Sequence, residues 1–308
     1  MSQVYSEFDV IVIGGGPAGL SAALLLVRAR RSVLVIDSGE PRNAPAEHMH
    51  GYLTRDSMPP EGFLELCREE VASYGAELVS DTVVAMSPDR AVKTASGRSY
   101  KARRVIVATG VRDILPGLPG FEDRWGRDLL HCPYCHGYEV ADRDFAVIAT
   151  HPGSLDHALL LRQWTNKISL IANGQQIGEQ DRQALEARGV VIIDSVATGL
   201  HISDDSVVGV EMGDTTHPCD VVFVAPQMRP RDAFVDVLGC QRDEFGFLQV
   251  DRTWRTSVSW VYAAGNNADA KAQVIAAAGQ GSSAAFNLNL DLTQEDTARA
   301  VAAAAKNG

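Results

Sequence analysis

Short, mostly apolar runs alternate along this chain with stretches in which apolar residues recur at helical spacing. The runs are 8–13, 32–36, 105–107, 145–148, 167–171 and 260–263. Leu20, Ala23, Leu24 and Val27 follow the first run at positions that share one helix face. Continuous apolar runs are typical of parallel strands that are buried on both faces. The pattern therefore predicts an α/β fold built from strand–helix–strand units.

Glycines mark the turn after the first run. The residues of this turn are Gly14, Gly15, Gly16, Pro17, Ala18 and Gly19. The spacing of Gly14, Gly16 and Gly19 is that of a dinucleotide-binding turn. The first glycine permits the tight turn, the second lets the backbone approach a pyrophosphate, and the third lets the helix pack on the strand. Asp37 ends the next strand, where an acid is expected to bind ribose hydroxyls. These residues predict a dinucleotide site.

A second strand–turn–helix frame lacks the glycines. The run 145–148 is followed by Ala149, Thr150, His151, Pro152, Gly153 and Ser154. Ala149 and His151 each place a Cβ where a pyrophosphate has to come close, and Pro152 removes a backbone donor. A helix over 155–164 and a strand over 167–171 follow, as in the first frame. We therefore expect a second dinucleotide-type unit whose nucleotide site has been lost.

Cys132 and Cys135 form a Cys-Pro-Tyr-Cys segment between the two frames, and His136 follows directly. This spacing brings two sulfurs within disulfide reach and lowers the pKa of one thiol. Zinc would need two further ligands at suitable spacing, which the sequence does not offer, so no metal is expected. Haem attachment and a glutaredoxin-like site share the spacing, but this pair lies beside a dinucleotide-binding unit. We interpret it as a redox pair coupled to the bound cofactor.

Composition and charge exclude several other classes of protein. The chain has 308 residues, 45% of them hydrophobic, and a formal net charge of -11. That charge argues against nucleic acid or an anionic membrane surface as a partner. No apolar run approaches the ~20 residues that span a bilayer, and the first residues do not resemble a signal peptide. We expect a cytoplasmic protein, in which the remaining cysteines, Cys67, Cys219 and Cys240, are small buried side chains.

Further segments resemble the thioredoxin reductase family of two-domain flavoproteins, and the resemblance covers nearly the whole chain. The residues that carry it are Ala108, Thr109, Gly110, Gly265, Asn266, Gln273 and Val274. In that family these segments complete an FAD site, so the resemblance implies FAD as the cofactor. The family has an acid on the flavin's ribityl chain where this chain has Asn266, whose amide can still hydrogen-bond a hydroxyl. Gln273 and Val274 fall where the family presents backbone N–H groups to the flavin ring.

The resemblance also implies roles for the dithiol. Carried over by position, Cys135 is the sulfur nearest the flavin, and Cys132 exchanges with the substrate. The family's acid after the second cysteine is replaced by His136, a better base near neutral pH because its unperturbed pKa is about 6.5. The family's basic cluster for the NADPH 2′-phosphate is missing, since residues 172–176 contain no arginine or lysine. We therefore expect no NADPH binding in the usual mode.

The order of the motifs predicts two Rossmann-like, three-layer dinucleotide-binding domains, the second inserted into the first. Residues 1–113 and 241–308 would form the FAD-binding domain, and residues 114–240 the NADPH-domain-like insertion that carries the dithiol. The hinges are expected at 115–120 and between residues 238 and 246. The tail is expected to form a short helix with Thr293 and Asp296 as a capping box. The resemblance further implies a homodimer.

Residues 132–139 resemble the microbial FAD-dependent oxidases that close disulfides in natural products of the holomycin and gliotoxin type without NADPH. The resemblance implies a dithiol oxidase, which converts a small-molecule dithiol to its disulfide and reduces O2 to hydrogen peroxide. Two alternatives stay open. One is a thioredoxin-type disulfide reductase fed by ferredoxin or another electron carrier. The other is a flavin-bound regulatory protein that uses the dithiol as a redox sensor.

Overall fold

The computed structural model describes residues 6–307. Its first sheet has seven strands in the order β3-β2-β1-β6-β5-β4, with β17 paired to β6. The strands are β1 (Ser6–Ile13), β2 (Val33–Asp37), β3 (Glu77–Ser80), β4 (Val83–Met86), β5 (Ala91–Thr94), β6 (Ser99–Val107) and β17 (Val261–Ala263). β1, β2, β3, β6 and β17 run parallel, and β5 is antiparallel to both of its neighbours, β4 and β6. The apolar runs predicted as buried parallel strands form the centre of this sheet.

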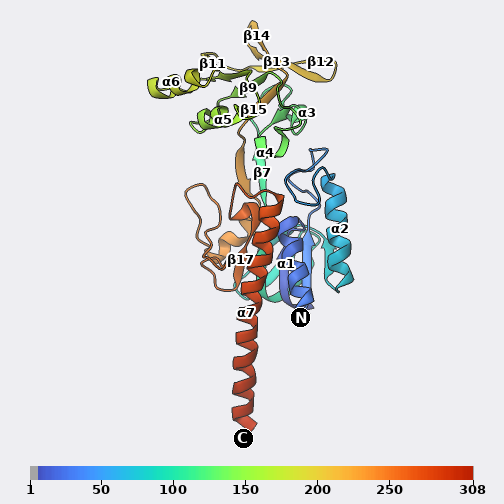
Figure 1. Cartoon of the computed structure of the whole chain (residues 1–308). Helices are drawn as coiled ribbons and strands as arrows, with labels where there is room; N and C mark the ends of the chain where they lie inside the picture. The colour runs from blue at the N-terminus through green and yellow to red at the C-terminus, as the bar shows by residue number, and fades with distance from the viewer. Residues whose placement is uncertain (1–5, 308) are drawn as a thin grey trace.

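Helices cover one face of the first sheet (Figure 1). They are α1 (Pro17–Arg28), α2 (Pro60–Ser73) and α7 (Val274–Asn307). Leu26 from α1, Phe63 from α2 and Leu288 from α7 share one buried core with Val12 of β1. α1 and α7 touch through their backbones, because a Cβ on Gly281 would lie 1.9 Å from the carbonyl oxygen of Ala18. This close packing holds the start of α7 beside the start of α1.

The second sheet has five parallel strands in the order β11-β10-β9-β15-β8. They are β8 (Leu129–Leu130), β9 (Phe145–Ile148), β10 (Ile168–Ile171), β11 (Val190–Ile193) and β15 (Val221–Val224). The helices of this part are α3 (Phe121–Arg124), α4 (Pro133–His136), α5 (Ser154–Leu161) and α6 (Glu179–Ala187). A three-stranded antiparallel sheet packs on one face and consists of β12 (Gly199–Ser203), β13 (Ser206–Met212) and β14 (Thr215–Pro218). Helix, sheet and sheet thus form three layers.

Two antiparallel strands connect the two parts of the molecule. β7 (Val111–Ile114) leads into the second part and β16 (Gln227–Pro230) leads back. The short helix η1 (Ala233–Leu238) follows β16, and its Val235 is buried in the core of the first sheet. We therefore propose a return boundary near residue 230, earlier than the residue 240 expected from the motifs. The proposed FAD-binding domain then comprises the segments before β7 and after β16.

α7 is one continuous helix that projects beyond the first sheet toward the C-terminus (Figure 1). The predicted capping box is therefore wrong. Thr293 lies inside the helix, where its hydroxyl donates to the carbonyl of Asn289. The physical reason is that no glycine or proline follows Gly281 before residue 308, while alanine, which favours helix, is frequent. Within residues 6–307 no helix, α7 included, is long and apolar enough to cross a membrane.

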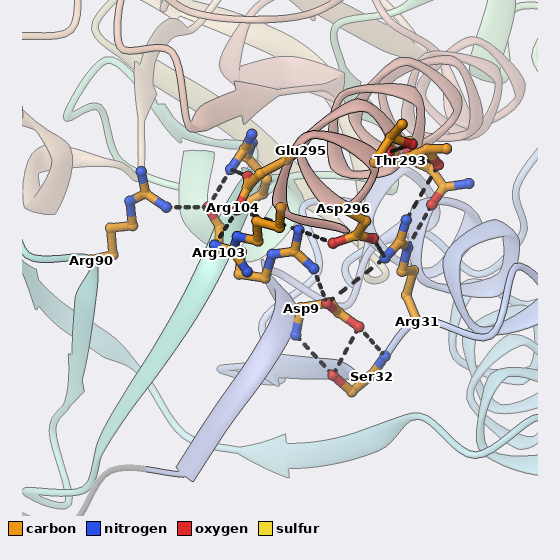
Figure 2. A network of polar contacts seen from close by, with 12 residues as sticks. Asp9, Arg31, Ser32, Arg90, Arg103, Arg104, Thr293, Glu295 and Asp296 are labelled. Carbon is orange, nitrogen blue, oxygen red and sulfur yellow. Dashed lines mark hydrogen bonds and ion pairs between the residues drawn. The ribbon is translucent and has the colours of Figure 1, made fainter. Parts of the chain in front are cut away.

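Arginines at the base of the first sheet hold α7 in place (Figure 2). Arg31 donates to Asp296 at 2.7 Å, and Arg103 on β6 donates to the same carboxylate at 2.5 Å. Arg104 pairs with Glu295 at 2.9 Å. These arginine side chains are largely buried, so the ion pairs act as a network rather than as isolated surface pairs. The network fixes the helix whose first residues line the cavity described below.

Candidate functional site

The turn between β1 and α1 needs glycine for steric reasons. Gly14 has a φ of +108°, and a Cβ there would lie 2.3 Å from the carbonyl oxygen of Ala108. A Cβ on Gly19 would lie 1.9 Å from the carbonyl oxygen of Gly14. Both distances are far below van der Waals contact. Glycine at positions 14 and 19 therefore allows α1 to pack closely against the sheet.

The same turn leaves backbone donors open at the start of α1. A Cβ on Gly16 would meet no atom within 4 Å, so the backbone there faces open space. Within residues 6–307 no hydrogen bond occupies the N–H groups of Gly16 and Ala18. Pro17 stands at the first helical turn, where its missing N–H leaves no bond unmade. Open N–H groups at the positive end of a helix can bind an anion such as a phosphate.

Two further strand ends approach this turn. Asp37 at the end of β2 accepts a hydrogen bond from the N–H of Gly15 at 2.9 Å. Thr109 and Gly110 follow β6, and Gly110 has a φ of +68°. Because β1, β2 and β6 are parallel neighbours, their carboxyl ends meet at one edge of the sheet. Ligands of parallel α/β sheets bind at such an edge.

Asn267, which no motif in the sequence singled out, fixes the backbone at Gly110. Asn267 is fully buried, its oxygen accepts from the N–H of Gly110 at 2.6 Å, and its amide donates to Asp232 at 2.9 Å. Burial raises the pKa of Asp232, while Arg242, which donates to it at 2.9 Å, opposes that shift. The only signal in the sequence was a second asparagine directly after Asn266.

Asn266 makes contacts that an aspartate could not make. Its amide donates to the carbonyl oxygens of Asp269 at 2.9 Å and Ala272 at 3.1 Å, whereas a carboxylate has no N–H. Its oxygen accepts from Arg42 at 3.3 Å. The asparagine therefore holds the loop that leads to Gln273 and α7. Its hydrogen bond to a ribityl hydroxyl stays a prediction.

Cys132 and Cys135 form a disulfide at the short helix α4. Pro133 is the first residue of this helix, a position that suits proline. The N–H of Gly137 donates to the carbonyl of Pro133 at 2.7 Å, and a Cβ on Gly137 would lie 3.0 Å from the ring of Trp164. The tight turn brings the two cysteine Cα atoms to 5.3 Å, within the normal disulfide range.

His136 ends α4 and lines the cavity beside the disulfide. Burial lowers the pKa of His136, and nearby His50 lowers it further, while Glu139 raises it. Within residues 6–307 its ring makes no hydrogen bond, so both nitrogens are open to a ligand. A neutral ring with a free lone pair near pH 7 is able to accept a proton.

The loop between β2 and α2 ties the first sheet to the inserted part. Arg42 makes a bidentate ion pair with Asp113 on β7, at 2.7 and 2.8 Å. His50 lies between Asp56, at 3.3 Å, and Glu139, at 3.5 Å. Glu139 follows α4, so the second contact joins the loop to the dithiol segment. Sequence motifs did not reveal the contacts of Arg42 with Asp113 and of His50 with Glu139, because the two residues of each pair lie far apart in the sequence.

These groups open onto one cavity of about 1000 Å³, at the upper end of small-molecule sites. All the cofactor and catalytic residues predicted from the sequence line it except Gly19, which packs beneath the turn. Their individual roles stay predictions. Six of the eight histidines also line the cavity, namely His48, His50, His131, His136, His151 and His157. In residues 6–307 no three His, Cys, Asp or Glu side chains converge as metal ligands.

The turn between β9 and α5 differs from the first turn, because its donors are occupied. Ser154 Oγ accepts hydrogen bonds from the N–H groups of Thr150 at 3.1 Å and His151 at 3.5 Å. The N–H of Gly153 donates to Nδ1 of His151 at 3.0 Å, and Pro152 has no N–H. The N–H of Ser154 donates to the carbonyl of His151. The N–H groups of this turn are therefore occupied, in contrast to those of Gly16 and Ala18 in the first turn.

The other cysteines have the properties of packing residues. Burial raises the pKa of Cys219 to about 12, and it also raises the pKa of Cys67 and of Cys240. Cys219 is buried, and the other two are half-buried. A thiol with a raised pKa carries little thiolate and is a poor nucleophile. The dithiol is therefore the better candidate for redox chemistry.

Comparisons with known proteins agree with this geometry. A family model described as pyridine nucleotide-disulphide oxidoreductase matches residues 8–281. Thioredoxin reductase sirT from Leptosphaeria maculans is 32% identical over 327 residues, covering 97% of this chain and 98% of that protein. The crystal structure of HlmI matches with a TM-score of 0.95 and 47% identity over 99% of both chains. The oxidoreductase from Agrobacterium tumefaciens matches with a TM-score of 0.87 and 32% identity, over 93% of this chain and 99% of that one.

These likenesses confirm the predicted fold class of two Rossmann-like domains, and FAD is the cofactor of such proteins. The residues present fit that cofactor. The open N–H groups at the start of α1 suit its pyrophosphate, Asp37 suits a ribose, and the cavity continues to the disulfide. This chain therefore belongs to the pyridine nucleotide-disulphide oxidoreductase family, as a thioredoxin reductase-like, FAD-dependent oxidoreductase.

Proposed function

We propose that this protein is a dithiol oxidase, which converts a small-molecule dithiol to its disulfide through Cys132 and Cys135 and reduces O2 to hydrogen peroxide. The observation that carries the proposal is the contrast between the two turns. The β1–α1 turn leaves its donors open for a cofactor, whereas the donors of the β9–α5 turn are occupied by Ser154 and His151. Without a nicotinamide site, a dithiol substrate is the electron source that the Cys132–Cys135 disulfide can accept from directly.

The surroundings of the second turn support the absence of NADPH binding in the usual mode. Residues 172–176, which follow β10, contain no arginine or lysine to pair with a phosphate. Asn173 in this segment is engaged inside the protein, because its amide donates to the carbonyl of Ala149 and its oxygen accepts from the N–H of Ala197, both at 3.1 Å. A nucleotide phosphate would therefore find no cation in this segment, and the amide of Asn173 is already engaged.

The proposed thiol exchange has two steps. A substrate thiolate attacks Sγ of Cys132, so that a substrate–Cys132 bond forms, the Cys132–Cys135 bond breaks and Cys135 leaves as a thiolate. The second substrate thiolate then attacks the first substrate sulfur and releases Cys132. The substrate has lost two electrons, which the reduced pair now holds. FAD, when bound, would supply the two-electron acceptor for the reduced pair, and O2 would be the final acceptor, with hydrogen peroxide as its product.

We assign His136 as the base for the second substrate thiol. A free thiol has a pKa of about 8.5, so most of it is protonated at neutral pH and attacks slowly. His136 directly follows Cys135, and its ring is open to the cavity. Because burial lowers its pKa, the ring stays unprotonated at neutral pH and can take the proton. His136 has to give up this proton before the next turnover, and the reduction of O2 to hydrogen peroxide consumes the two thiol protons.

Dithiols and nicotinamide nucleotides are expected to act differently on the FAD-loaded protein. Under anaerobic conditions, dithiothreitol should bleach the flavin absorption, because it reduces the Cys132–Cys135 pair directly. NADPH and NADH at millimolar concentration should leave the absorption unchanged, because the second turn has no open phosphate site. Absorbance titration in a sealed cuvette measures both, and final addition of dithionite shows that the flavin is reducible. Rapid bleaching by NADPH would restore an ordinary reductase and contradict the proposal.

A further inference from the structure

The segment that carries the dithiol has one polar link to the first part of the molecule. Nε2 of His50, in the loop between β2 and α2, lies 3.5 Å from Oε1 of Glu139, which follows α4. Within residues 6–307 no other hydrogen bond or ion pair joins residues 131–143 to the segments before β7 or after β16, and the backbone hydrogen bonds of these residues stay inside the inserted part. The contact between His50 and Glu139 therefore ties the dithiol segment to the first part.

His50 lies on a turn that is anchored in the core of the first part. The N–H of Met49 donates to the carbonyl of Met58 at 2.8 Å, and the N–H of Ser57 donates to the carbonyl of Met49 at 3.0 Å. Met49 is buried in the core that contains Phe63 of α2, and Met58 packs against this core. The residue next to His50 is thus fixed by both backbone hydrogen bonds and apolar packing.

The ring of His50 is held on its other side by Asp56. Nδ1 of His50 lies 3.3 Å from Oδ2 of Asp56, and Oδ1 of Asp56 accepts from the N–H of Gly51 at 2.7 Å. Hydrogen bonds from Gly51 and His50 lower the pKa of Asp56, which is therefore a carboxylate at neutral pH. Because a carboxylate only accepts hydrogen bonds, Nδ1 is the donor in this contact, and Nε2 is left for Glu139.

The contact lies beside the groups proposed to react. His50, Cys135 and His136 line the same cavity, and Glu139 follows His136 by three residues. Burial lowers the pKa of His136, His50 lowers it further and Glu139 raises it, so both partners of the contact lie within electrostatic reach of this ring. Within residues 6–307 the ring of His136 makes no hydrogen bond. Its position therefore depends on how the backbone of its own segment is held.

We propose that His50 is a positioning residue, which holds Glu139 and thereby keeps Cys135 and His136 in place at the cavity. The inference rests on the proposed function, in which the sulfur of Cys135 has to stay beside the flavin and the ring of His136 beside the substrate thiol. Displacing reacting groups by a fraction of their contact distance removes much of a rate enhancement. His50 itself neither exchanges with a sulfur nor takes the substrate's proton.

An absorption spectrum taken without substrate tests the inference. A thiolate held beside oxidised flavin gives a long-wavelength shoulder, which is measured anaerobically in the FAD-loaded single-cysteine variant that shows it, Cys132→Ser or Cys135→Ser. Adding His50→Leu should lower the shoulder per bound flavin by roughly half, because a partly exposed ion pair changes a population by up to about fivefold. Glu139→Leu should lower it equally, and the two changes together should lower it no further, because both remove the same contact.

Two further variants serve as controls. Glu139→Gln should keep the shoulder, because the amide N–H of glutamine can donate to Nε2 of a neutral His50 ring and so preserve the contact. His201→Leu removes a second histidine–glutamate contact of nearly the same length, 3.6 Å to Glu211, on strands β12 and β13. Neither of these two residues lines the cavity, so this variant should leave the shoulder unchanged.

An unchanged shoulder in His50→Leu and Glu139→Leu would overturn the inference, as would additive losses, an equal loss in Glu139→Gln, or no shoulder in either single-cysteine variant. Oxygen uptake by the wild-type protein with dithiothreitol judges the proposed function separately. A shoulder that depends on His50, in a protein that consumes no oxygen, would support the positioning role and contradict the oxidase. Oxygen uptake together with a shoulder that is insensitive to His50 would support the oxidase and contradict the positioning role.

Discussion

Serine in place of Cys132 or Cys135 is expected to reduce dithiol oxidation at least about a thousandfold, because each sulfur takes part in every turnover. The two variants should differ in their absorption spectra. Cys132→Ser leaves Cys135 as a free thiol, and a thiolate beside the oxidised flavin gives a long-wavelength shoulder that fades as falling pH protonates it. Cys135→Ser should lack the shoulder. Steady-state rates and spectra of the FAD-loaded variants at neutral and acidic pH check both expectations.

Cys67→Ser is the matched control for these substitutions. Cys67 is half-buried on α2, burial raises its pKa, and it does not line the cavity. Its replacement should leave both the rate and the spectrum unchanged. A long-wavelength shoulder in Cys135→Ser instead of Cys132→Ser would mean that Cys132 is the sulfur nearest the flavin.

Alanine in place of His136 is expected to slow dithiol oxidation at neutral pH by roughly 10²–10⁴-fold, the usual contribution of a positioned general base. FAD content and the disulfide should be retained, because His136 makes no hydrogen bond to the rest of the described chain. The rate of the variant should recover at alkaline pH, where the substrate thiol ionises without help. Rates measured between acidic and alkaline pH test this expectation.

The pH dependence of kcat/KM in the wild-type protein gives a second test of His136 as the base. Because burial lowers the pKa of His136, the ring stays unprotonated further into the acid range than a free histidine, whose pKa is about 6.5. The acid limb of kcat/KM should therefore lie below pH 6.5 and should be absent from His136→Ala. His201→Ala, at an exposed histidine, should keep the wild-type profile. A His136→Ala deficit that is the same at every pH would argue for a structural role instead.

The first turn could be predicted from the sequence because its constraints are local. Gly14 and Gly19 are needed for contacts with residues of the same strand–helix unit or of a neighbouring strand, and these contacts follow from the geometry of the unit itself. The clustering of the predicted residues around one cavity follows in the same way, because parallel strands bring their carboxyl ends to one edge. Asp37 and Thr109 are examples.

The sequence revealed only some of the features that disfavour nucleotide binding at the turn between β9 and α5. The sequence indicated that the side chains of Ala149 and His151 crowd the site and that Pro152 lacks a donor. The structure adds that Ser154 and His151 themselves occupy the remaining N–H groups. Such side-chain hydrogen bonds depend on rotamers, which a pattern of residue types does not specify.

Contacts between distant segments escaped the sequence analysis. Asn267 reaches Gly110 and Asp232, and Arg42 reaches Asp113, over separations that no periodicity describes. The continuous helix α7 was misjudged for a related reason. Thr293 and Asp296 have the spacing of a capping box, but in the structure Asp296 is bound by Arg31 and lies inside the helix. Local propensity is a weak guide where tertiary ion pairs stabilise the element.

Oxygen consumption with a simple dithiol shows whether this protein passes electrons from a dithiol to O2. The FAD-loaded protein is supplied with dithiothreitol in air-saturated buffer, with an oxygen electrode and a peroxide assay as the readouts. We expect catalytic oxygen uptake with one hydrogen peroxide formed for each dithiothreitol oxidised, and loss of both in Cys132→Ser. Negligible turnover in air, together with activity when reduced ferredoxin and thioredoxin are supplied, would contradict the oxidase and favour a carrier-fed reductase.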